Sequence, residues 1–124
     1  MAQKTCLVVD DSRTVRKVIS KIVKELGFEA IEAEDGKVAL EECNKSMPSV
    51  VMLDWNMPVM DGMEFFKELI KMPNRSDTKV IFCTTENEIH KIKEAIDLGC
   101  DEYVMKPFNR SILQEKLIQV GALQ

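Results

Sequence analysis

The stretch VVMLDWNMPVMDG, Val50–Gly62, joins a short apolar run directly to a carboxylate. The run Val50–Leu53 has the length and composition of a strand that is covered on both faces of a sheet. Asp54 follows it at once, and Pro58 and Gly62 beyond Asp54 indicate a loop. A carboxylate at the tip of a buried strand is costly without a compensating role. The stretch therefore predicts a buried sheet whose edge carries a functional Asp54.

The composition of the chain indicates one small globular domain. Its 124 residues are 45% apolar and 31% charged, and a domain of this size buries roughly two-thirds of the surface of its unfolded chain. The net charge is −4 and the pI is near 5.1, so nucleic acid is not expected as a partner. The opening segment MAQKTCLVVDD has too short an apolar run for a signal peptide or a membrane span. We therefore expect a cytoplasmic protein that does not contact the membrane.

The cysteines and the single histidine are interpreted as buried and surface residues respectively. No two cysteines have the C-x-x-C spacing, so small buried thiols in a reducing cytosol are expected rather than disulfides or zinc ligands. His90 lies in a charged, helix-like segment without a second histidine to complete a metal or catalytic site, and we expect it on the surface. The four cysteines are Cys6, Cys43, Cys83 and Cys100.

Strand-like and helix-like segments alternate along the chain. Apolar residues at helical spacing run from Val15 to Leu26, before the helix-stopping Gly27, and again from Ile89 to Ile96. Five strands and five helices in alternation predict an α/β fold, a doubly wound parallel sheet with helices on both faces. The predicted strands are Thr5–Val9, Glu29–Ala33, Val50–Leu53, Val80–Cys83 and Tyr103–Met105. Pairs with capping-box spacing, before the third and fourth helices, are Asp61 with Glu64 and Thr85 with Glu88.

The residues that follow the strands gather polar groups at one edge of the predicted sheet. Ligands of doubly wound sheets bind at the carboxyl ends of the strands, near the point where the strand order reverses. The strand Glu29–Ala33 is expected at the edge of the sheet, too far away to contribute. The groups expected to meet are the carboxylates of Asp10, Asp11 and Asp54, the hydroxyl of Thr84 and the ammonium of Lys106.

These carboxylates predict a divalent cation site. Neighbouring carboxylates repel one another, so at least one should have a raised pKa when no cation is bound. Mg²⁺ is expected because it prefers oxygen ligands and takes one or two carboxylates together with phosphate oxygens. Asp11 and Asp54 are the expected direct ligands, with Asp10 acting through water, and the lack of His and Cys argues against zinc. The alternative is that Asp10 or Asp11 only caps the first helix.

Beside a cation, Asp54 has the chemistry of a phosphoryl acceptor. Carboxylates form aspartyl-phosphate intermediates, and Mg²⁺ neutralises the charge of the transferring group. Lys106 is expected as a point charge on the phosphoryl oxygens, and the Thr84 hydroxyl as a hydrogen-bond donor to one of them. A cis bond between Lys106 and Pro107 would aim the ammonium inward.

The segments LVVDD, LDWNMPVMDG, CTTE and YVMKPF resemble, in order and spacing, the receiver domain of two-component response regulators. The likeness covers essentially the whole chain, so it implies one receiver domain over residues 1–124 and no output domain. It is strongest to the single-domain chemotaxis response regulators. The resemblance implies a flavodoxin-like (βα)5 fold with strand order 2-1-3-4-5, which the chemotaxis protein itself exemplifies.

The resemblance also implies roles for individual residues. Asp54 would accept a phosphoryl group from a histidine kinase, Thr84 would sense it and Lys106 would clamp it. Tyr103 would change rotamer as Thr84 moves. The implied Mg²⁺ ligands are Asp10, Asp11, Asp54 and the backbone carbonyl of Asn56.

A surface formed by the fourth helix, the fifth strand and the fifth helix is the implied partner site. The positions that match the family there are Ile92, Tyr103 and Lys116. The implied partner is an output protein such as the flagellar motor switch, with a phosphatase as a further partner, and the domain would be a monomer.

Three positions are expected to tune the lifetime of the phosphorylated state. Asn56 and Glu86 match the chemotaxis pattern. Thr85 departs from it, because the family usually has a small residue there, and its bulk should narrow access to the phosphoryl group.

A phosphoacceptor aspartate is also compatible with two other functions. The first is a phosphotransfer intermediate or phosphate sink, which would share the same site residues. The second is an aspartyl-phosphate hydrolase of the dehalogenase-like type, which needs an acid two residues after the nucleophile, where this chain has Asn56. We therefore expect a phosphoacceptor that catalyses only its own phosphorylation and dephosphorylation, not an enzyme.

Overall fold

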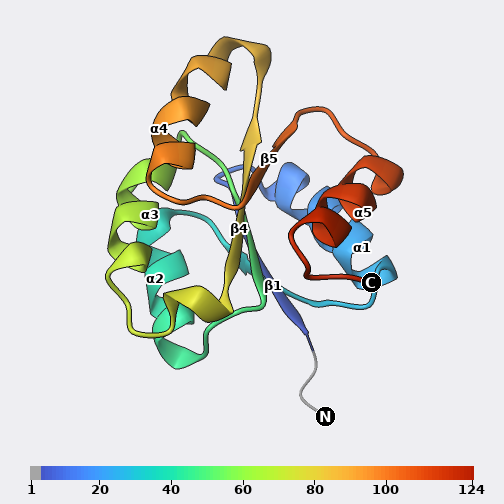
Figure 1. The fold of residues 1–124 in the computed structure, drawn as a ribbon, viewed down its shortest axis with the longest axis horizontal. Coiled ribbons are helices and arrows are strands. Elements are labelled where there is room, and N and C mark those ends of the chain that lie inside the picture. The colour runs from blue at the N-terminus through green and yellow to red at the C-terminus, as the bar shows by residue number, and fades with distance from the viewer. Residues whose placement is uncertain (1–3) are drawn as a thin grey trace.

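The computed structural model describes residues 4–124, which form a parallel sheet between two layers of helices (Figure 1). The sheet comprises β1 (Thr5–Val9), β2 (Glu29–Ala33), β3 (Val50–Leu53), β4 (Lys79–Thr84) and β5 (Glu102–Met105). The α-helices are α1 (Arg13–Glu25), α2 (Gly36–Lys45), α3 (Gly62–Ile70), α4 (Ile92–Asp97) and α5 (Arg110–Gln119). Two 3₁₀ segments, η1 (Arg75–Asp77) and η2 (Glu86–Lys91), flank β4.

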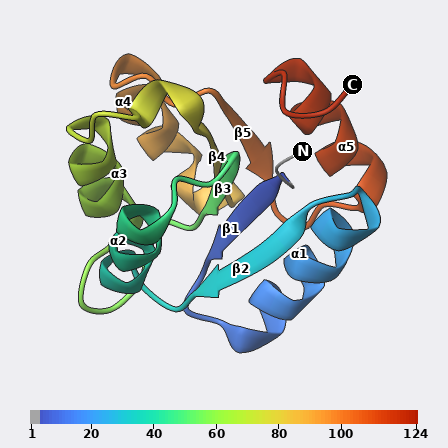
Figure 2. The same cartoon turned by 90° about the horizontal axis from the view of Figure 1, so that it is seen from below.

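The strand order is β2-β1-β3-β4-β5, and every neighbouring pair is parallel. The predicted doubly wound sheet and its order are therefore confirmed. The order reverses between β1 and β3, so the carboxyl ends of these two strands lie side by side. Figure 2 shows β1 and β3 between the edge strand β2 and the strands β4 and β5.

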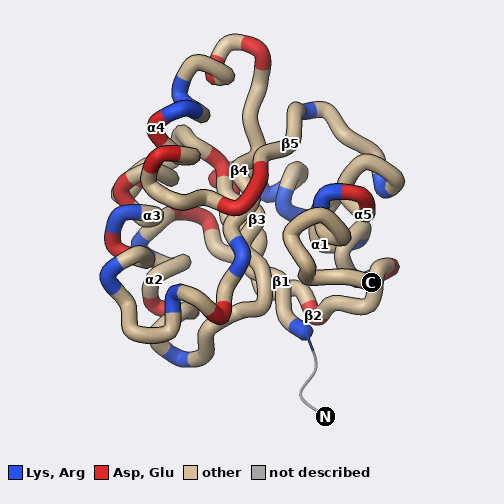
Figure 3. The backbone as a smooth tube through the Cα atoms, in the orientation of Figure 1, with Lys and Arg blue, Asp and Glu red and all other residues tan. Residues whose placement is uncertain are grey.

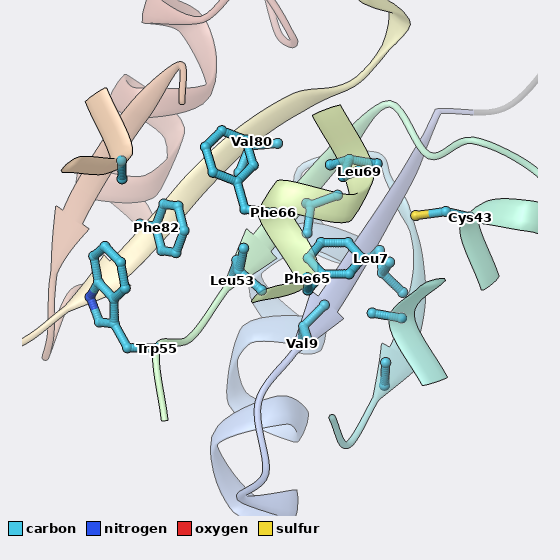
Figure 4. Packing of buried hydrophobic residues seen from close by; sticks show 14 residues of the cluster. Leu7, Val9, Cys43, Leu53, Trp55, Phe65, Phe66, Leu69, Val80 and Phe82 are labelled. Carbon is cyan, nitrogen blue, oxygen red and sulfur yellow. The ribbon is translucent and has the colours of Figure 1, made fainter. Parts of the chain in front are cut away.

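Alternate residues of each strand pack against opposite helical layers, which explains the continuous apolar runs of the sequence. On one side Leu7, Val51 and Phe82 pack with residues of α2, α3 and α4 (Figure 4). On the other side Val8 and Met52 pack with residues of α1 and α5. Strands covered on both faces need apolar side chains at successive positions, unlike strands with one wet face.

The predicted end of the first helix and the predicted start of the third helix are confirmed. Ser12 caps α1 by accepting a hydrogen bond from the Val15 amide, and Asp61 forms the predicted capping box with Glu64. Gly27 follows α1 with φ 98°, a left-handed conformation that glycine adopts without strain. Val18 is the exception in the apolar stripe, because 54% of its surface is exposed.

The segment before α4 differs from the expectation. Residues Glu86–Lys91 form a 3₁₀ helix, and the α-helix begins only at Ile92. Thr85 makes no capping hydrogen bond to a backbone amide, so the predicted capping box with Glu88 is wrong. The Thr85 hydroxyl instead donates to the Glu88 carboxylate at 3.0 Å. Side-chain pairing replaces capping here because the first turn is 3₁₀, not α-helical.

The cysteines are largely buried and the single histidine is on the surface, as the sequence predicts. Cys6, Cys43 and Cys83 are buried, Cys100 is partly buried, and all four are free thiols. His90 is exposed. Figure 3 shows acidic and basic residues distributed over the helices of both layers. None of the helices within residues 4–124 is long and apolar enough to cross a membrane.

Candidate functional site

The predicted site residues meet at the carboxyl edge of the sheet because the strand ladders extend into the residues that follow. The Asp10 amide donates to the Ala33 carbonyl at 3.1 Å, and the Asp54 amide donates to the Val9 carbonyl at 3.0 Å. These bonds fix Asp10 and Asp54 beside each other at the tips of β1 and β3. Thr84, the last residue of β4, is fully buried next to them along the sheet.

The carboxylates of Asp10, Asp11 and Asp54 form one cluster. Each offers an oxygen, and these oxygens all lie within 4.8 Å of one another. Asp10 and Asp54 are only 3% and 8% exposed, whereas Asp11 is exposed to solvent. The cluster thus has a buried side and an open side through which a cation or a phosphate group can approach.

Lys106 supplies the positive charge of the site. Its ammonium donates to Asp10 Oδ2 at 3.2 Å and to Asp54 Oδ1 at 3.1 Å. The Lys106 amide donates to the Thr84 carbonyl at 2.7 Å, which ties the residue to the end of β4. The Lys106–Pro107 peptide bond, whose isomer the sequence left open, is cis.

Burial and charge shift the pKa values of the two central groups. Burial raises the pKa of Asp54, the nearby Asp10 adds to this, and Lys106 only partly offsets it. For Lys106, burial disfavours the charged form, but attraction by Asp54 and Asp10 is stronger and raises its pKa. The expected raised pKa within the acid cluster is present, although burial contributes more than repulsion between carboxylates.

Neither Asp10 nor Asp11 is the cap of α1, because that position belongs to Ser12. Asp10 Oδ1 accepts the Ser12 amide at 2.9 Å, just before the helix begins. The alternative that these acids are merely helix caps is therefore wrong. One oxygen of Asp10 bonds to the backbone and the other to Lys106, whereas Asp11 points a carboxylate oxygen into the cluster with no hydrogen bond among the described residues.

The loop after Asp54 is held against the site. The Gly62 amide donates to the Trp55 carbonyl at 2.9 Å, and a Cβ at Gly62 would lie only 2.0 Å from the Asp54 carbonyl oxygen. Only glycine therefore allows α3 to begin so close to the phosphoacceptor candidate. Trp55 stacks on Phe82, with ring centroids 4.0 Å apart (Figure 4).

Glu88 links Asn56 and Thr85. From the sequence, Glu88 is expected only as the partner of Thr85 in a capping box. The Asn56 amide donates to Glu88 Oε2, and the Thr85 hydroxyl donates to Glu88 Oε1. The Lys91 ammonium donates to Asn56 Oδ1 at 3.4 Å. Glu86, another position expected to tune the lifetime of the phosphorylated state, is exposed and has no hydrogen bond to Asn56 within residues 4–124. The side-chain pairing across two loops has no signature in local spacing, so the sequence could not reveal it.

The three residues expected at the partner surface lie on α4, β5 and α5. Ile92 and Tyr103 are partly buried and pack against the same apolar cluster. The Lys116 ammonium lies 5.6 Å from the centre of the Tyr103 ring and 3.7 Å from the Glu102 carboxylate. The structure thus groups Tyr103 with Lys116, and the role of this surface stays a prediction.

The donor set fits a hard divalent cation. Three carboxylates from two neighbouring strand ends provide oxygen ligands, and Mg²⁺ is bound in this way beside phosphate groups. The partly open side of the cluster leaves room for water and phosphate ligands. The three carboxylates therefore form a cluster that could bind Mg²⁺.

A match to a known protein family identifies the class of domain that carries this site. The response regulator receiver domain family matches residues 6–118, which include every site residue named above. The chain belongs to this family. Receiver domains are signalling domains and not classical enzymes, and they typically use Mg²⁺ at an acidic pocket.

Individual relatives of this receiver domain are chemotaxis proteins. It is 36% identical over 113 residues to chemotaxis protein CheY1 of Helicobacter pylori, covering 90% of this chain and 91% of that protein. It is 35% identical over 115 residues to chemotaxis protein CheY-3 of Vibrio cholerae, covering 92% and 88%. The structure of chemotaxis response regulator CheY4 of Vibrio cholerae superposes with a TM-score of 0.87 at 34% identity, covering 96% of this chain and 99% of that chain.

Proposed function

We propose that this receiver domain is a phosphorylation-dependent switch in chemotaxis, with Asp54 as the phosphoacceptor. The observation that carries the proposal is the contact of Lys106 with both Asp10 and Asp54 at the reversal point of the sheet. This contact places the candidate nucleophile Asp54, the Asp10 carboxylate and the Lys106 ammonium together where doubly wound sheets bind ligands. The likeness to chemotaxis proteins over about nine-tenths of the chain supports the pathway.

The phosphoryl donor is a histidine kinase. An oxygen of the Asp54 carboxylate attacks the phosphorus of a phosphohistidine, the P–N bond breaks, and its electron pair stays on the imidazole. Lys106 holds the phosphoryl oxygens by charge. Asp11, Asp54 and the Asn56 carbonyl would hold Mg²⁺, with Asp10 acting through water, and the bound cation would supply positive charge beside the transferring group.

Thr84 is the sensor of the phosphoryl group. Within residues 4–124 its hydroxyl donates to one group, the neighbouring Thr85 carbonyl, at 3.3 Å, which is a long bond for a buried hydroxyl. A phosphoryl group on Asp54 offers strong acceptor oxygens that compete well for this donor. The movement of Thr84 toward them changes the packing space available to Tyr103 on the adjacent strand.

The surface that responds comprises Ile92, Tyr103 and Lys116. Tyr103 packs on the core that supports β4 and contacts Lys116 of α5. A shift at the end of β4 therefore changes the packing of the Tyr103 ring, which in turn affects α4 and α5. Two packings that differ by a few kcal/mol are enough for such a local event to change the affinity for a partner. The partner is an output protein such as the flagellar motor switch.

Binding to purified motor switch proteins, with beryllofluoride as the phosphoryl mimic, tests the function. Activated protein should bind tightly, and Tyr103→Ala should weaken that binding without changing the labelling of Asp54. Glu68→Ala is a matched control, because Glu68 is exposed on α3, outside this surface, and pairs with Lys71 at 3.1 Å. Equal binding by activated and unactivated protein, combined with efficient return of the phosphoryl group to histidine proteins, would favour a phosphate sink instead.

A further inference from the structure

The Glu88 carboxylate connects the two loops that flank the predicted phosphoacceptor. Oε1 accepts the Thr85 hydroxyl at 3.0 Å, and Oε2 accepts the Asn56 amide. Asn56 follows Asp54 by two residues on the loop after β3, whereas Thr85 directly follows Thr84 at the end of β4. One side chain thus uses both of its oxygens to hold together two loops that are 29 residues apart, 85 − 56.

The Asn56 amide group is fixed from a second side by Lys91. The Lys91 ammonium donates to Asn56 Oδ1 at 3.4 Å and lies 5.9 Å from the centre of the Trp55 ring. Glu88 and Lys91 both belong to the 3₁₀ segment η2, which begins directly after Thr85. The amide of Asn56 therefore donates to a carboxylate and accepts from an ammonium of the same segment, which defines its orientation.

We propose that Glu88 is a positioning residue that sets the lifetime of phosphorylated Asp54 by holding Asn56 and Thr85 in place. The inference rests on the proposed phosphorylation of Asp54. It adds a residue, and a physical link, to the positions expected to tune that lifetime. Glu86, by contrast, makes no hydrogen bond to Asn56 in the part of the chain that the structure describes.

The affected step is hydrolysis of the aspartyl phosphate. A water oxygen attacks the phosphorus, the bond between phosphorus and the Asp54 oxygen breaks, and its electrons return to the carboxylate. Inorganic phosphate leaves, and the proton lost by the water passes to phosphate or solvent. Attack needs an in-line approach. Two side chains pinned across the neighbouring loops restrict that approach, and their release should open it.

The test is the decay of phosphorylated Glu88→Ala, labelled with acetyl phosphate and Mg²⁺ and followed after removal of the donor. Loss of both acceptor oxygens frees Asn56 and Thr85, so the decay should accelerate by about fivefold or more. Glu88→Gln retains one acceptor oxygen and should decay at an intermediate rate. Glu68→Ala is the matched control, because the Glu68 carboxylate also accepts a side-chain hydrogen bond, here from Lys71, but lies exposed on α3. Its decay should equal that of the wild type.

A double-mutant cycle separates positioning from general loosening of the fold. If Glu88 acts through Asn56, Glu88→Ala should change the decay rate far less in an Asn56→Ala background than in the wild type. If Glu88→Ala only lowered the thermal stability, the changes in decay rate caused by Glu88→Ala and by Asn56→Ala would multiply in the double variant. Wild-type decay in Glu88→Ala, slower decay, or multiplicative effects in the double variant would each overturn the proposal.

The labelling results distinguish an error in the proposed phosphorylation of Asp54 from an error in the role of Glu88. If Asp54 is not the acceptor, the wild-type protein takes up no label, or Asp54→Asn takes up as much as the wild type. If only the role of Glu88 is wrong, the wild type labels on Asp54 and Glu88→Ala decays like it. Should Glu88→Ala fold poorly, Thr85→Val provides the second variant, since it removes the hydroxyl donor and retains the side-chain volume.

Discussion

The Lys106 ammonium lies 3.1 Å from Asp54 Oδ1, across 52 positions of the sequence. The same ammonium lies 3.2 Å from Asp10 Oδ2, so a single ammonium pairs with two buried carboxylates. This shared pairing does not fully compensate the burial of Asp54, whose pKa remains raised. The site therefore has an excess of negative charge, and a bound cation relieves that excess.

Asp54→Asn should stabilise the protein at pH 7 in the absence of Mg²⁺. Because the folded-state pKa of Asp54 is raised above the ordinary 3.8, the folded protein binds this proton more tightly than the unfolded chain does. The resulting stabilisation is complete below the unfolded pKa and is lost as pH rises through the folded pKa. A neutral Asn avoids that loss, and a gain of about 1 kcal/mol corresponds to roughly 4 °C in Tm for a domain of this size.

Calorimetry at pH 7 and pH 4 measures this effect. The difference in Tm between Asp54→Asn and the wild type should shrink as the pH falls toward 4. Asp97→Asn, which changes an exposed acid on α4, should shift Tm very little at either pH. An Asp54→Asn protein that melts at or below the wild-type temperature at pH 7 would contradict the charge analysis.

Mg²⁺ should change the fluorescence of Trp55, which adjoins Asp54 and stacks on Phe82. Asp11→Ala should weaken binding strongly, because the Asp11 carboxylate is an expected direct ligand. Asp10→Ala should weaken it less, since Asp10 is bonded to Lys106 and to the Ser12 amide. A titration that is unchanged in both variants would remove the metal site from the account.

Thr85→Ala should shorten the lifetime of phosphorylated Asp54 and speed labelling by small phosphodonors, without a change in Mg²⁺ affinity. Thr85 makes no capping bond to a backbone amide, so its loss should lower Tm only slightly. Thr85→Ser keeps the hydroxyl that Glu88 accepts and removes only the methyl group, so it separates bulk from hydrogen bonding. Clearly reduced stability combined with wild-type rates would show that Thr85 has only a structural role.

Val59→Gly should stabilise the protein. Val59 is 76% exposed and has a φ of 68°, a left-handed conformation that is strained for a β-branched residue. Relief of that strain should raise the free energy of unfolding by about 1 kcal/mol, measured by urea denaturation. Val18→Gly is the opposite control: Val18 is also exposed but lies within α1, so glycine should destabilise the protein there by about 1 kcal/mol. A destabilised Val59→Gly would contradict the strain.

The sheet could be predicted from sequence because its signals are local. Strands covered on both faces, such as β1 and β3, appear as mainly apolar runs, whereas the edge strand β2 alternates apolar and charged residues; all three have the predicted bounds. The same logic brought Asp10, Asp54 and Lys106 to one edge, since the residues after parallel strands must meet there. The strand β4 extends one residue beyond the prediction at each end, to Lys79 and Thr84, and β5 begins one residue earlier, at Glu102, because these polar residues lie outside the apolar runs.

Features that depend on pairing between distant segments could not be predicted. The spacing of Thr85 and Glu88 is correct for a capping box, yet Glu88 contacts Asn56 on another loop and the segment forms a 3₁₀ helix. The exposure of Val18 likewise follows from the position of α1 on the sheet, which an apolar stripe does not specify. In both cases local spacing is compatible with several tertiary partners, and packing selects among them.

Phosphorylation of Asp54 is the central claim, and intact-protein mass spectrometry after incubation with acetyl phosphate and Mg²⁺ tests it most directly. The account predicts one acid-stable, base-labile phosphoryl group per chain, located on Asp54 by peptide analysis and absent from Asp54→Asn. Label that persists in Asp54→Asn, or continuous turnover of a phosphomonoester without a stable labelled protein, would contradict it.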